Sequence, residues 1–316
     1  MGQIMTDLNA DSTRNIAVVV LNYCNYVDTV CCLDRIVKSE ALNIVLVDNL
    51  SPDGSGERLR QEYAQFANVT YIQSGSNYGY AAGNNVGIKY AVEHLGAQYI
   101  CVLNNDTLPT EDALLALVRH LEVRSCCGIV GPVILENSND YIIQSAGANI
   151  DLKRGRTDPF HKGEIFSYGN YTEICPYVSG ACMMFRASDL CRLGYLPECY
   201  FLFFEETEWC LRASRIGYTV ECIWNSVIVH SGSASIGRER GLSGYLMTRN
   251  RAMFEKRNAR WGEYVIFRTR FMIKILWYQY IRGRDLRWEI AAFRDGLFGR
   301  TASQFASIVP NAGDLQ

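Results

Sequence analysis

Several features of zinc-binding, secreted and membrane-spanning chains are missing from this sequence. None of its twelve cysteines forms the C-x-x-C spacing of a structural zinc site, and some, such as Cys101 and Cys222, lie inside apolar segments. The N-terminus lacks a charged segment followed by an apolar one, which is the pattern of a secretion signal. In the aromatic C-terminal region the longest uncharged run, residues 275–281, is far shorter than the ~20 residues that cross a bilayer. These absences predict a cytoplasmic protein with reduced cysteines.

Positive charge is scarce except near the C-terminus. The 316 residues carry 31 Lys and Arg against 33 Asp and Glu. From Arg238 to the end, 15 basic residues face 7 acidic ones, which gives this part +8 and leaves −10 for the rest. The imbalance favours an anionic partner for the C-terminal quarter, either an acidic membrane surface or a phosphorylated substrate. A solvated basic face on a helix that packs against the rest of the chain is the competing interpretation.

Apolar segments alternate with helical patterns through the first part of the chain, whose overall composition is that of an ordinary globular protein. The expected strands cover residues 16–21, 44–47, 69–72 and 99–103. This alternation predicts an α/β fold with a parallel sheet and right-handed crossovers. The expected organisation is a disordered lead-in (1–14), one domain (15–260) and a basic, aromatic helical extension (261–316).

Polar residues follow each of these strands, at positions Asn22, Asp48, Asn77 and Asp106. Ligands of open α/β sheets bind outside the carboxyl ends of the strands, so four polar ends along one edge predict a nucleotide cleft. The carboxylate of Asp106, beside the amides of Asn104 and Asn105, suits a divalent cation that holds a diphosphate. A simple polar turn at 104–106 is the alternative when this segment is considered alone.

Glycines Gly79, Gly83 and Gly87 recur at helical spacing after the third strand. They leave one helix face without side chains, so that a ligand or a strand can come close to the backbone. Tight packing of helix on strand explains Gly87 equally well and Gly79 less well.

Three carboxylates follow the strongly apolar residues 200–204 in the second half. If a helix starts near Glu205, Glu208 can pair with Arg212 one turn later, which leaves Glu206 unpaired. Alone, this cluster would be read as an acidic helix start. His230 ends a later apolar segment, where a structural histidine is the usual finding.

Taken in order, these motifs resemble the inverting family 2 glycosyltransferases, in particular the bacterial rhamnosyltransferase-like branch that builds surface polysaccharide. The resemblance extends from about residue 16 to residue 257 and rests on the segments VVLNY (19–23), VDNLS (47–51), DGS (53–55), NYGYAAGNNVG (77–87), LNND (103–106), SGAC (179–182), FEETEWCLR (204–212) and VH (229–230). Each motif is weak singly, and their order makes the match specific.

The resemblance implies a GT-A fold, in which a Rossmann-like, mostly parallel sheet is flanked by helices. The donor half would cover about 15–135 and the acceptor half about 136–260. It also implies a Mn²⁺ or Mg²⁺ ion, a dTDP- or UDP-sugar as donor, and direct displacement with inversion. A glycan or a lipid-linked glycan would be the acceptor, and nucleic acid is not an expected partner.

The resemblance also carries roles onto matching residues. The donor side would be formed by Asn22, Asp48, Ser51, Asn77, Gly79, Gly83, Asn84, Asn104 and Asn105. The acceptor side would be formed by Ser179, Gly180, Ala181, Glu205, Trp209 and Arg212. Asp106 and His230 would hold the metal, and Glu206 would be the general base, which its unpaired position on the helix also favours. Three positions depart from the family pattern, since Asn104 stands for the first Asp of D-x-D, Glu206 for Asp, and Glu208 for Asp.

Two other classes remain as alternatives. A sugar-phosphate nucleotidyltransferase would carry a glycine-rich loop with a basic residue after the first strand, but Asn22-Tyr23-Cys24-Asn25 follows here. A scaffold that binds nucleotide sugar without catalysis would not need Asp106, Glu206 and His230 together. A single displacement needs no enzyme nucleophile, and no activated Ser or Cys arrangement is evident in the sequence.

Overall fold

The computed structural model describes residues 15–138, 140–231, 240–282 and 287–299. The expected lead-in lies outside the described residues. The strands are β1 (Ile16–Asn22), β2 (Leu42–Asp48), β3 (Val69–Gln73), β4 (Tyr99–Asn104), β5 (Thr107–Leu108), β6 (Cys127–Glu136), β7 (Ile143–Ser145), β8 (Ala148–Asp151), β9 (Arg156–Pro159), β10 (Thr172–Ile174), β11 (Cys182–Arg186) and β12 (Thr219–His230). The helices are α1 (Tyr26–Leu33), α2 (Ser55–Tyr63), α3 (Tyr80–Glu93), α4 (Glu111–Val123), α5 (Leu190–Leu193), α6 (Glu205–Arg215), α8 (Arg240–Asn258), α9 (Trp261–Arg282) and α10 (Arg287–Phe298), with short 3-10 turns η2 (Ala187–Asp189) and η3 (Glu198–Tyr200).

One mixed sheet forms the centre of the molecule, in the order β10-β12-β6-β11-β4-β1-β2-β3. Strands β1 to β4 are parallel, as the alternation of the sequence predicts, and β6 is parallel to β12. Strand β11 runs antiparallel between β4 and β6, and β10 runs antiparallel to β12. Strand β11 pairs with β4 along one edge and with β6 along the other. The sheet therefore continues without a break from strands β1 to β4 into strands β6 and β12.

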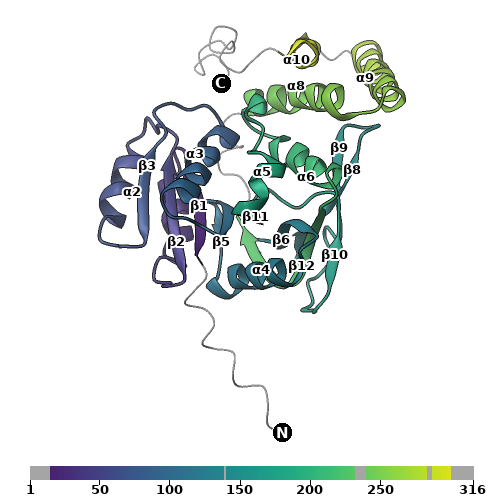
Figure 1. Cartoon of the computed structure of the whole chain (residues 1–316). Helices are drawn as coiled ribbons and strands as arrows, with labels where there is room; N and C mark the ends of the chain where they lie inside the picture. The colour runs from purple at the N-terminus through teal and green to yellow at the C-terminus, as the bar shows by residue number, and fades with distance from the viewer. Residues whose placement is uncertain (1–14, 139, 232–239, 283–286, 300–316) are drawn as a thin grey trace.

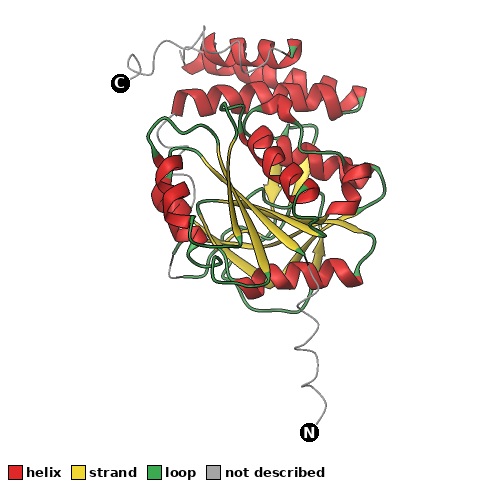
Figure 2. Cartoon of the chain, turned by 60° about the vertical axis from the view of Figure 1, so that its left-hand side comes forward, coloured by secondary structure: helices red, strands yellow, loops and turns green. Residues whose placement is uncertain are grey.

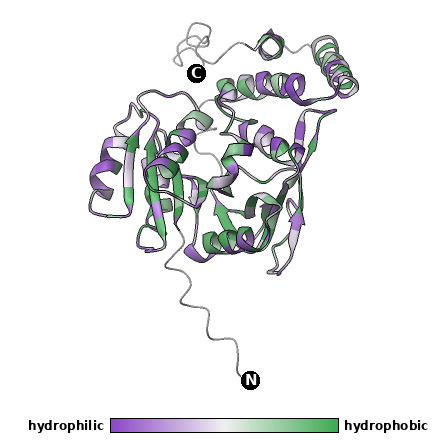
Figure 3. Cartoon of the chain, in the orientation of Figure 1, coloured by the Kyte–Doolittle hydropathy of each residue, from purple (hydrophilic) through white to green (hydrophobic). Residues whose placement is uncertain are grey.

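Helices cover both faces of this sheet (Figures 1 and 2). Buried side chains of α1, α2 and α4 pack on one face, and those of α3, α5 and α6 pack on the other. Consecutive strand residues such as Val18 and Val19 belong to opposite clusters, so β1 is apolar on both sides. The strands of this sheet are accordingly coloured mostly as hydrophobic residues in Figure 3.

Three segments differ from what their sequence patterns predict. The pattern of residues 26–38 predicts one helix over this range, but α1 ends at Leu33 and turns follow it. The apolar segments 217–222 and 227–231 predict two separate strands, but they belong to one strand, β12, with an irregularity between Ile223 and Val227. The pairing partner β6 continues past this irregularity, which keeps β12 in register beyond it.

The C-terminal helices form a further layer, above α3 and α6 in Figure 1. Phe254 of α8 contacts Phe204 at the start of α6. Gly296 of α10 lies so close to the backbone of Arg249 that a Cβ at this position would overlap it. Among the described residues no helix is long and apolar enough to cross a membrane.

Candidate active site

The carboxyl ends of β1 and β2 meet in a buried polar network. Asn22 is fully buried, and its amide nitrogen donates to Asp48 Oδ1 at 2.8 Å, Ser51 Oγ at 3.1 Å and Ser55 Oγ at 3.0 Å. The Ser51 hydroxyl donates to the same Asp48 oxygen at 2.6 Å, and the Ser51 N–H donates to Oδ2 at 3.0 Å. Gly56, which the sequence analysis did not single out, leaves the space that the carboxylate fills. Asp48 is thus held rigidly at the expected sheet edge.

Amides extend this network sideways. Asn49 donates to Asn77 Oδ1 at 2.8 Å, and the same oxygen accepts from the Gly79 N–H at 3.0 Å. Asn105 donates to Thr29 Oγ1 at 2.8 Å. The turn after the third strand is therefore fixed to the end of β2.

Two of the expected donor residues take part in packing. A Cβ on Gly83 would overlap the side chain of Leu21, so this glycine lets α3 lie on β1. Asn84 is fully buried, and its amide donates to the carbonyl of Tyr80 within the same helix at 2.9 Å. A direct donor contact for these two residues stays a prediction. Gly79 differs from them, since its φ of +97° and its closeness to the Phe201 backbone admit only glycine.

Tyr80 links the two halves of the site. Its hydroxyl lies 2.9 Å from Asn104 Oδ1 and 2.9 Å from the carbonyl of Gly180. Burial raises its pKa well above the usual value, and the negative charges of Glu205, Glu206 and Asp106 raise it further. This tyrosine therefore stands among three carboxylates, and the sequence analysis assigned it no role although it lies within the motif 77–87. The loop Ser179–Ala181 crosses beside it, where the Asn104 N–H donates to the Ala181 carbonyl at 2.9 Å and Ser179 Oγ accepts from the Ala181 N–H at 3.2 Å.

Asp106 and His230 are adjacent because β5 pairs with the end of β12. Nε2 of His230 lies 3.1 Å from Asp106 Oδ1, and Nδ1 lies 2.9 Å from Gln144 Oε1. The Ser231 N–H donates to the carbonyl of Asp106 at 2.9 Å. Gln144, which the sequence analysis missed, thus orients the imidazole with Nε2 toward the carboxylate.

Glu206 projects from the first turn of α6, which begins at Glu205 as expected. Its Oε1 accepts from the Tyr177 hydroxyl at 3.1 Å, its Oε2 is buried without a partner, and its side chain lies against Gly180. Burial raises its pKa above the usual value, while the hydrogen bond from Tyr177 opposes this shift. Burial therefore outweighs the hydrogen bonds that favour the ionised form of this carboxyl.

Glu205 is enclosed more completely, with only 3% of its surface exposed. Burial raises its pKa well above the usual value, and the neighbouring Glu206 adds to this effect. Glu205 thus lies in the protein interior, because the start of α6 turns it inward. Its expected place on the acceptor side stays a prediction.

Trp209 and Arg212 also serve the protein interior. Trp209 is fully buried, its ring meets Phe185 edge to face, and its Nε1 donates to the Gly194 carbonyl at 2.9 Å. Arg212 donates to the carbonyls of Leu193 and Tyr195 at 2.8 and 3.1 Å. Both side chains thus fasten α6 to the segment before it, and their acceptor contacts stay a prediction.

The Glu208 carboxylate likewise makes contacts within the protein. Arg212 is 3.9 Å from it, as the helical spacing predicted, but Arg257 of α8 makes the shorter contacts at 2.8 and 3.0 Å. Asn258 and the Tyr200 hydroxyl donate to it as well. Glu208 is thereby committed to binding α8, which leaves Glu206 as the partly exposed carboxylate of α6.

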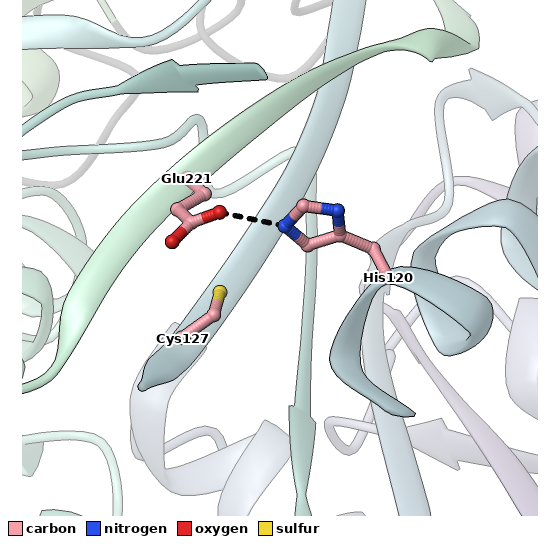
Figure 4. Close-up of side chains that lie close together, drawn as sticks. All are labelled: His120, Cys127 and Glu221. Atoms are coloured by element: carbon pink, nitrogen blue, oxygen red, sulfur yellow. Dashed lines mark hydrogen bonds and ion pairs between the residues drawn. The ribbon is translucent and has the colours of Figure 1, made fainter. Parts of the chain in front are cut away.

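A second cluster of potential metal ligands lies at the other end of the strands, where His120, Cys127 and Glu221 meet (Figure 4). Glu221 is fully buried and accepts from Thr219 at 2.5 Å and Arg124 at 3.2 Å, with His120 Nε2 at 2.6 Å. Burial tends to raise the pKa of Glu221, but these three hydrogen bonds bring it below the usual value. Burial raises the pKa of Cys127 strongly, which keeps the thiol protonated. The charge of the Glu221 carboxylate is already balanced by these partners, and the Cys127 thiol beside it is neutral. The cluster therefore fastens α4 to β12.

The profile of glycosyl transferase family 2 matches residues 16–193, which is more than half of the chain. The chain therefore belongs to this family, as its motifs predicted.

Curated relatives carry hexosyl- and rhamnosyltransferase names. The low-salt glycan biosynthesis hexosyltransferase Agl10 of Haloferax volcanii is 29% identical over 212 residues, which are 64% of this chain and 62% of Agl10. The dTDP-rhamnosyl transferase RfbF of Shigella flexneri is 24% identical over 217 residues, 69% of each chain. The N-acetylglucosaminyl-diphospho-decaprenol L-rhamnosyltransferase of Mycobacterium tuberculosis is 24% identical over 216 residues, 63% of this chain and 69% of the relative. The chain thus spans less than two thirds of Agl10 and slightly more of the other two.

Solved structures share the fold over nearly the whole chain. The mannosyltransferase PcManGT of Pyrobaculum calidifontis, solved with GDP-Man and Mn²⁺, superimposes with a TM-score of 0.56 at 16% identity, covering 96% of this chain and 79% of its own. GalNAc-T7, solved with UDP, GalNAc and Mn²⁺, gives a TM-score of 0.61 at 14% identity, covering 95% of this chain and 59% of its own. At such identities the likeness concerns the fold alone, and that fold is the predicted GT-A fold.

Proposed function

We propose that this protein is a metal-dependent, inverting glycosyltransferase. It moves a sugar from a nucleotide diphosphate to a glycan or polyprenyl-diphosphate-linked acceptor in the synthesis of a bacterial surface polysaccharide, such as O-antigen or capsule. The observation that carries the proposal is the position of the Tyr80 hydroxyl, which lies 2.9 Å from Asn104 Oδ1, two residues before Asp106, and 2.9 Å from the carbonyl of Gly180, against which the Glu206 side chain lies. This hydroxyl joins the turn that carries the Asp106 carboxylate to the loop beside the Glu206 carboxylate. A transferase needs one such group toward the diphosphate and another toward the acceptor.

Asp106 and His230 fit a divalent cation. A carboxylate oxygen and an imidazole nitrogen suit Mn²⁺, and Asp106 alone suits Mg²⁺. The two atoms are 3.1 Å apart, close to the spacing of about 3 Å between neighbouring ligands of one octahedral ion with bonds of about 2.1 Å. Gln144 holds the other ring nitrogen, as outer-shell partners of metal-binding histidines do. When bound, the ion would supply charge relief to the departing diphosphate.

Glu206 would act as general base. The acceptor oxygen bonds to the anomeric carbon while the bond from that carbon to the diphosphate oxygen breaks, and the acceptor proton passes to the Glu206 carboxylate. Burial raises the pKa of this carboxyl, which makes its ionised form a stronger base than an exposed glutamate. Asp48, with Asn22 and Ser51 around it, would face the nucleoside, and Asn104 and Asn77 would face the donor from the neighbouring turns.

The first candidate donor is dTDP-L-rhamnose. Two relatives named above are rhamnosyltransferases, and one carries dTDP in its name. The runner-up is a UDP-hexose, and the support for it is that the relative Agl10 is named a hexosyltransferase. A scaffold that binds a nucleotide sugar without transfer is the alternative outside catalysis.

The C-terminal helices would bring the protein to the cytoplasmic face of the membrane, where a lipid-linked acceptor lies. Helix α9 packs through Phe267 and Phe271, which contact Phe293 of α10. Its opposite side exposes Ile266 and Ile273, with 42% and 60% of their surfaces accessible, and Arg270 between them. An apolar stripe among cations suits the headgroup layer of an anionic bilayer. Because this layer lies on the side of the molecule to which β1, β2 and β4 point, the active site would open near the membrane.

The test is a panel of nucleotide sugars, each added to the purified protein with and without Mn²⁺. A ligand that binds the folded state raises the melting temperature, and dTDP-L-rhamnose should give the largest shift in the presence of the metal. Transfer of labelled sugar to a lipid-linked acceptor then separates an enzyme from a scaffold. A donor that binds but is never transferred, with any acceptor, would support the scaffold.

A further inference from the structure

The segment that leads into Glu206 has an unusual backbone. Phe201, Phe203 and Phe204 all have positive φ, at 71°, 72° and 76°. Non-glycine residues avoid this region, and each costs on the order of 1 kcal/mol or more unless its surroundings hold it. Three of them within four residues, ending at the N-cap of α6, make the direction of Glu206 dependent on whatever holds this segment.

One side chain of α8 holds it. The amide nitrogen of Asn250, which is fully buried, donates to the carbonyls of Tyr200 at 3.0 Å, Leu202 at 2.6 Å and Phe203 at 3.0 Å. The two N–H groups of the Asn250 amide thus donate to three carbonyls. The left-handed residues direct these carbonyls toward α8. Arg249 fixes the amide from behind, since its guanidinium donates to Asn250 Oδ1 at 2.6 Å.

The same segment also reaches the donor half. The carbonyl of Phe201 accepts from the Tyr80 N–H at 2.6 Å, and Gly79 lies against it. Tyr80 in turn donates its hydroxyl to the end of β4 or to the loop before β11. Residues 200–204 are therefore held between α3 on one side and α8 on the other, directly before the proposed base.

We infer that Asn250 is a positioning residue for transfer, which acts through residues 200–204 to aim Glu206. The inference rests on the proposed role of Glu206 and extends it to a helix outside the region that matches the family profile. Without the amide, the carbonyls of Leu202 and Phe203 lose this donor, the carbonyl of Tyr200 keeps only the longer bond from Arg249 Nη1 at 3.3 Å, and the left-handed backbone relaxes. The carboxylate then moves away from the acceptor hydroxyl while the binding of the nucleotide diphosphate is unchanged.

The experiment compares Asn250→Ala with Asn258→Ala in the full chain. Asn258 is a matched control, because it is a buried asparagine of the same helix whose amide bonds Glu208 and the Phe254 carbonyl instead. We expect Asn250→Ala to lower kcat by about 10- to 100-fold, the penalty of a misplacement near 1 Å, with KM for the donor within about two-fold. Asn258→Ala should lower the melting temperature without this loss of kcat.

Amide hydrogen exchange supplies a readout that does not depend on activity. Peptides that cover residues 200–206 should lose protection in Asn250→Ala and keep it in Asn258→Ala. If Asn250→Ala does not fold, Asn250→Ser, which keeps one shorter donor, replaces it. Unchanged protection, or equal kcat values for the two variants, would overturn the inference. Full turnover of Glu206→Gln would instead overturn the proposed base, whatever Asn250→Ala does.

Discussion

His230 Nε2 lies 3.1 Å from Asp106 Oδ1, although 124 positions separate the two residues in the chain. Strand β12 brings them together, because its last residue pairs with Thr107 directly after Asp106. The histidine and the carboxylate therefore stand on one rigid pair of strands, and a metal between them would not depend on a loop closing.

His230→Ala should weaken the metal-dependent binding of UDP or dTDP by about 10- to 100-fold, because one ligand of the ion is removed. The measurement is a Mn²⁺ titration of nucleotide binding by calorimetry. His94→Ala is the matched control, since this exposed histidine follows the far end of α3. An unchanged dependence on Mn²⁺ would rule out the role of His230.

Glu206→Gln should lower turnover by about 10²- to 10⁴-fold, because the amide keeps the shape of the side chain and loses its basicity. Donor binding should stay nearly unchanged. Glu205→Gln is the matched control, and it should have little effect on turnover, because the Glu205 side chain is enclosed by the protein. If Glu206→Gln keeps full turnover while Glu205→Gln has none, the general base is Glu205 and not Glu206.

The pH profile of turnover reports the same carboxylate. Burial raises the pKa of Glu206, and the base must be ionised, so activity should fall as the pH drops through a value above the ~4.3 of an ordinary glutamate. The Tyr177 hydrogen bond stabilises the ionised form. Tyr177→Phe should therefore shift the acid limb of kcat to higher pH, and a shift to lower pH would contradict the assignment.

The sequence was sufficient to predict the family, the order of strands and helices in the first part of the chain, and the clustering of Asn22, Asp48 and Asp106 at one edge of the sheet. These features follow from local patterns: apolar strands, polar strand ends and the direction of parallel strands. The inward turn of Trp209 and Arg212 could not be predicted in this way. It depends on which face of α6 meets the segment before it, a tertiary choice that the spacing of the acids does not reveal.

Residues that act across the fold were also hidden. Gln144 and Asn250 stand in segments without a recognisable motif, and Tyr80 lies in the motif 77–87 without a role assigned to it. Each of the three matters only through a partner that is distant in sequence. A signal existed for Tyr80 alone, since it directly follows the turn at Gly79, where α3 begins at a sheet edge.

Glu255 should make the stability of the protein depend on pH. This residue of α8 is fully buried, neither carboxylate oxygen has a partner, and burial raises its pKa to about 8, with Glu263 and Asp151 adding to the effect. In the unfolded chain its pKa is near 4.3, so the folded state holds one more proton between the two values. Stability should fall, by on the order of a few kcal/mol, as the pH rises from about 4.5 to 8.

Glu255→Gln should remove this part of the pH dependence and stabilise the protein at pH 8 more than at pH 5. Denaturant unfolding at the two pH values measures the difference. Glu93→Gln is a suitable control, because Glu93 is exposed at the end of α3 and does not act on Glu255. Equal changes in the free energy of unfolding at both pH values would show that Glu255 does not titrate in this range.

Membrane binding is tested on α9 by point changes, because a cut after Arg260 would also remove α10, which covers α8. Ile266 and Ile273, seven positions apart, lie on the exposed side opposite Phe267 and Phe271. Replacing both with Glu should lower recovery with floating anionic liposomes by about ten-fold or more, because two apolar anchors are lost and two negative charges face the lipid. Val123→Glu with Ile165→Glu changes the net charge equally at exposed apolar sites on other elements, so it should leave flotation intact. Equal recovery of both double variants and the unchanged protein would place the acceptor-bound enzyme away from the bilayer and assign the exposed stripe of α9 to another partner.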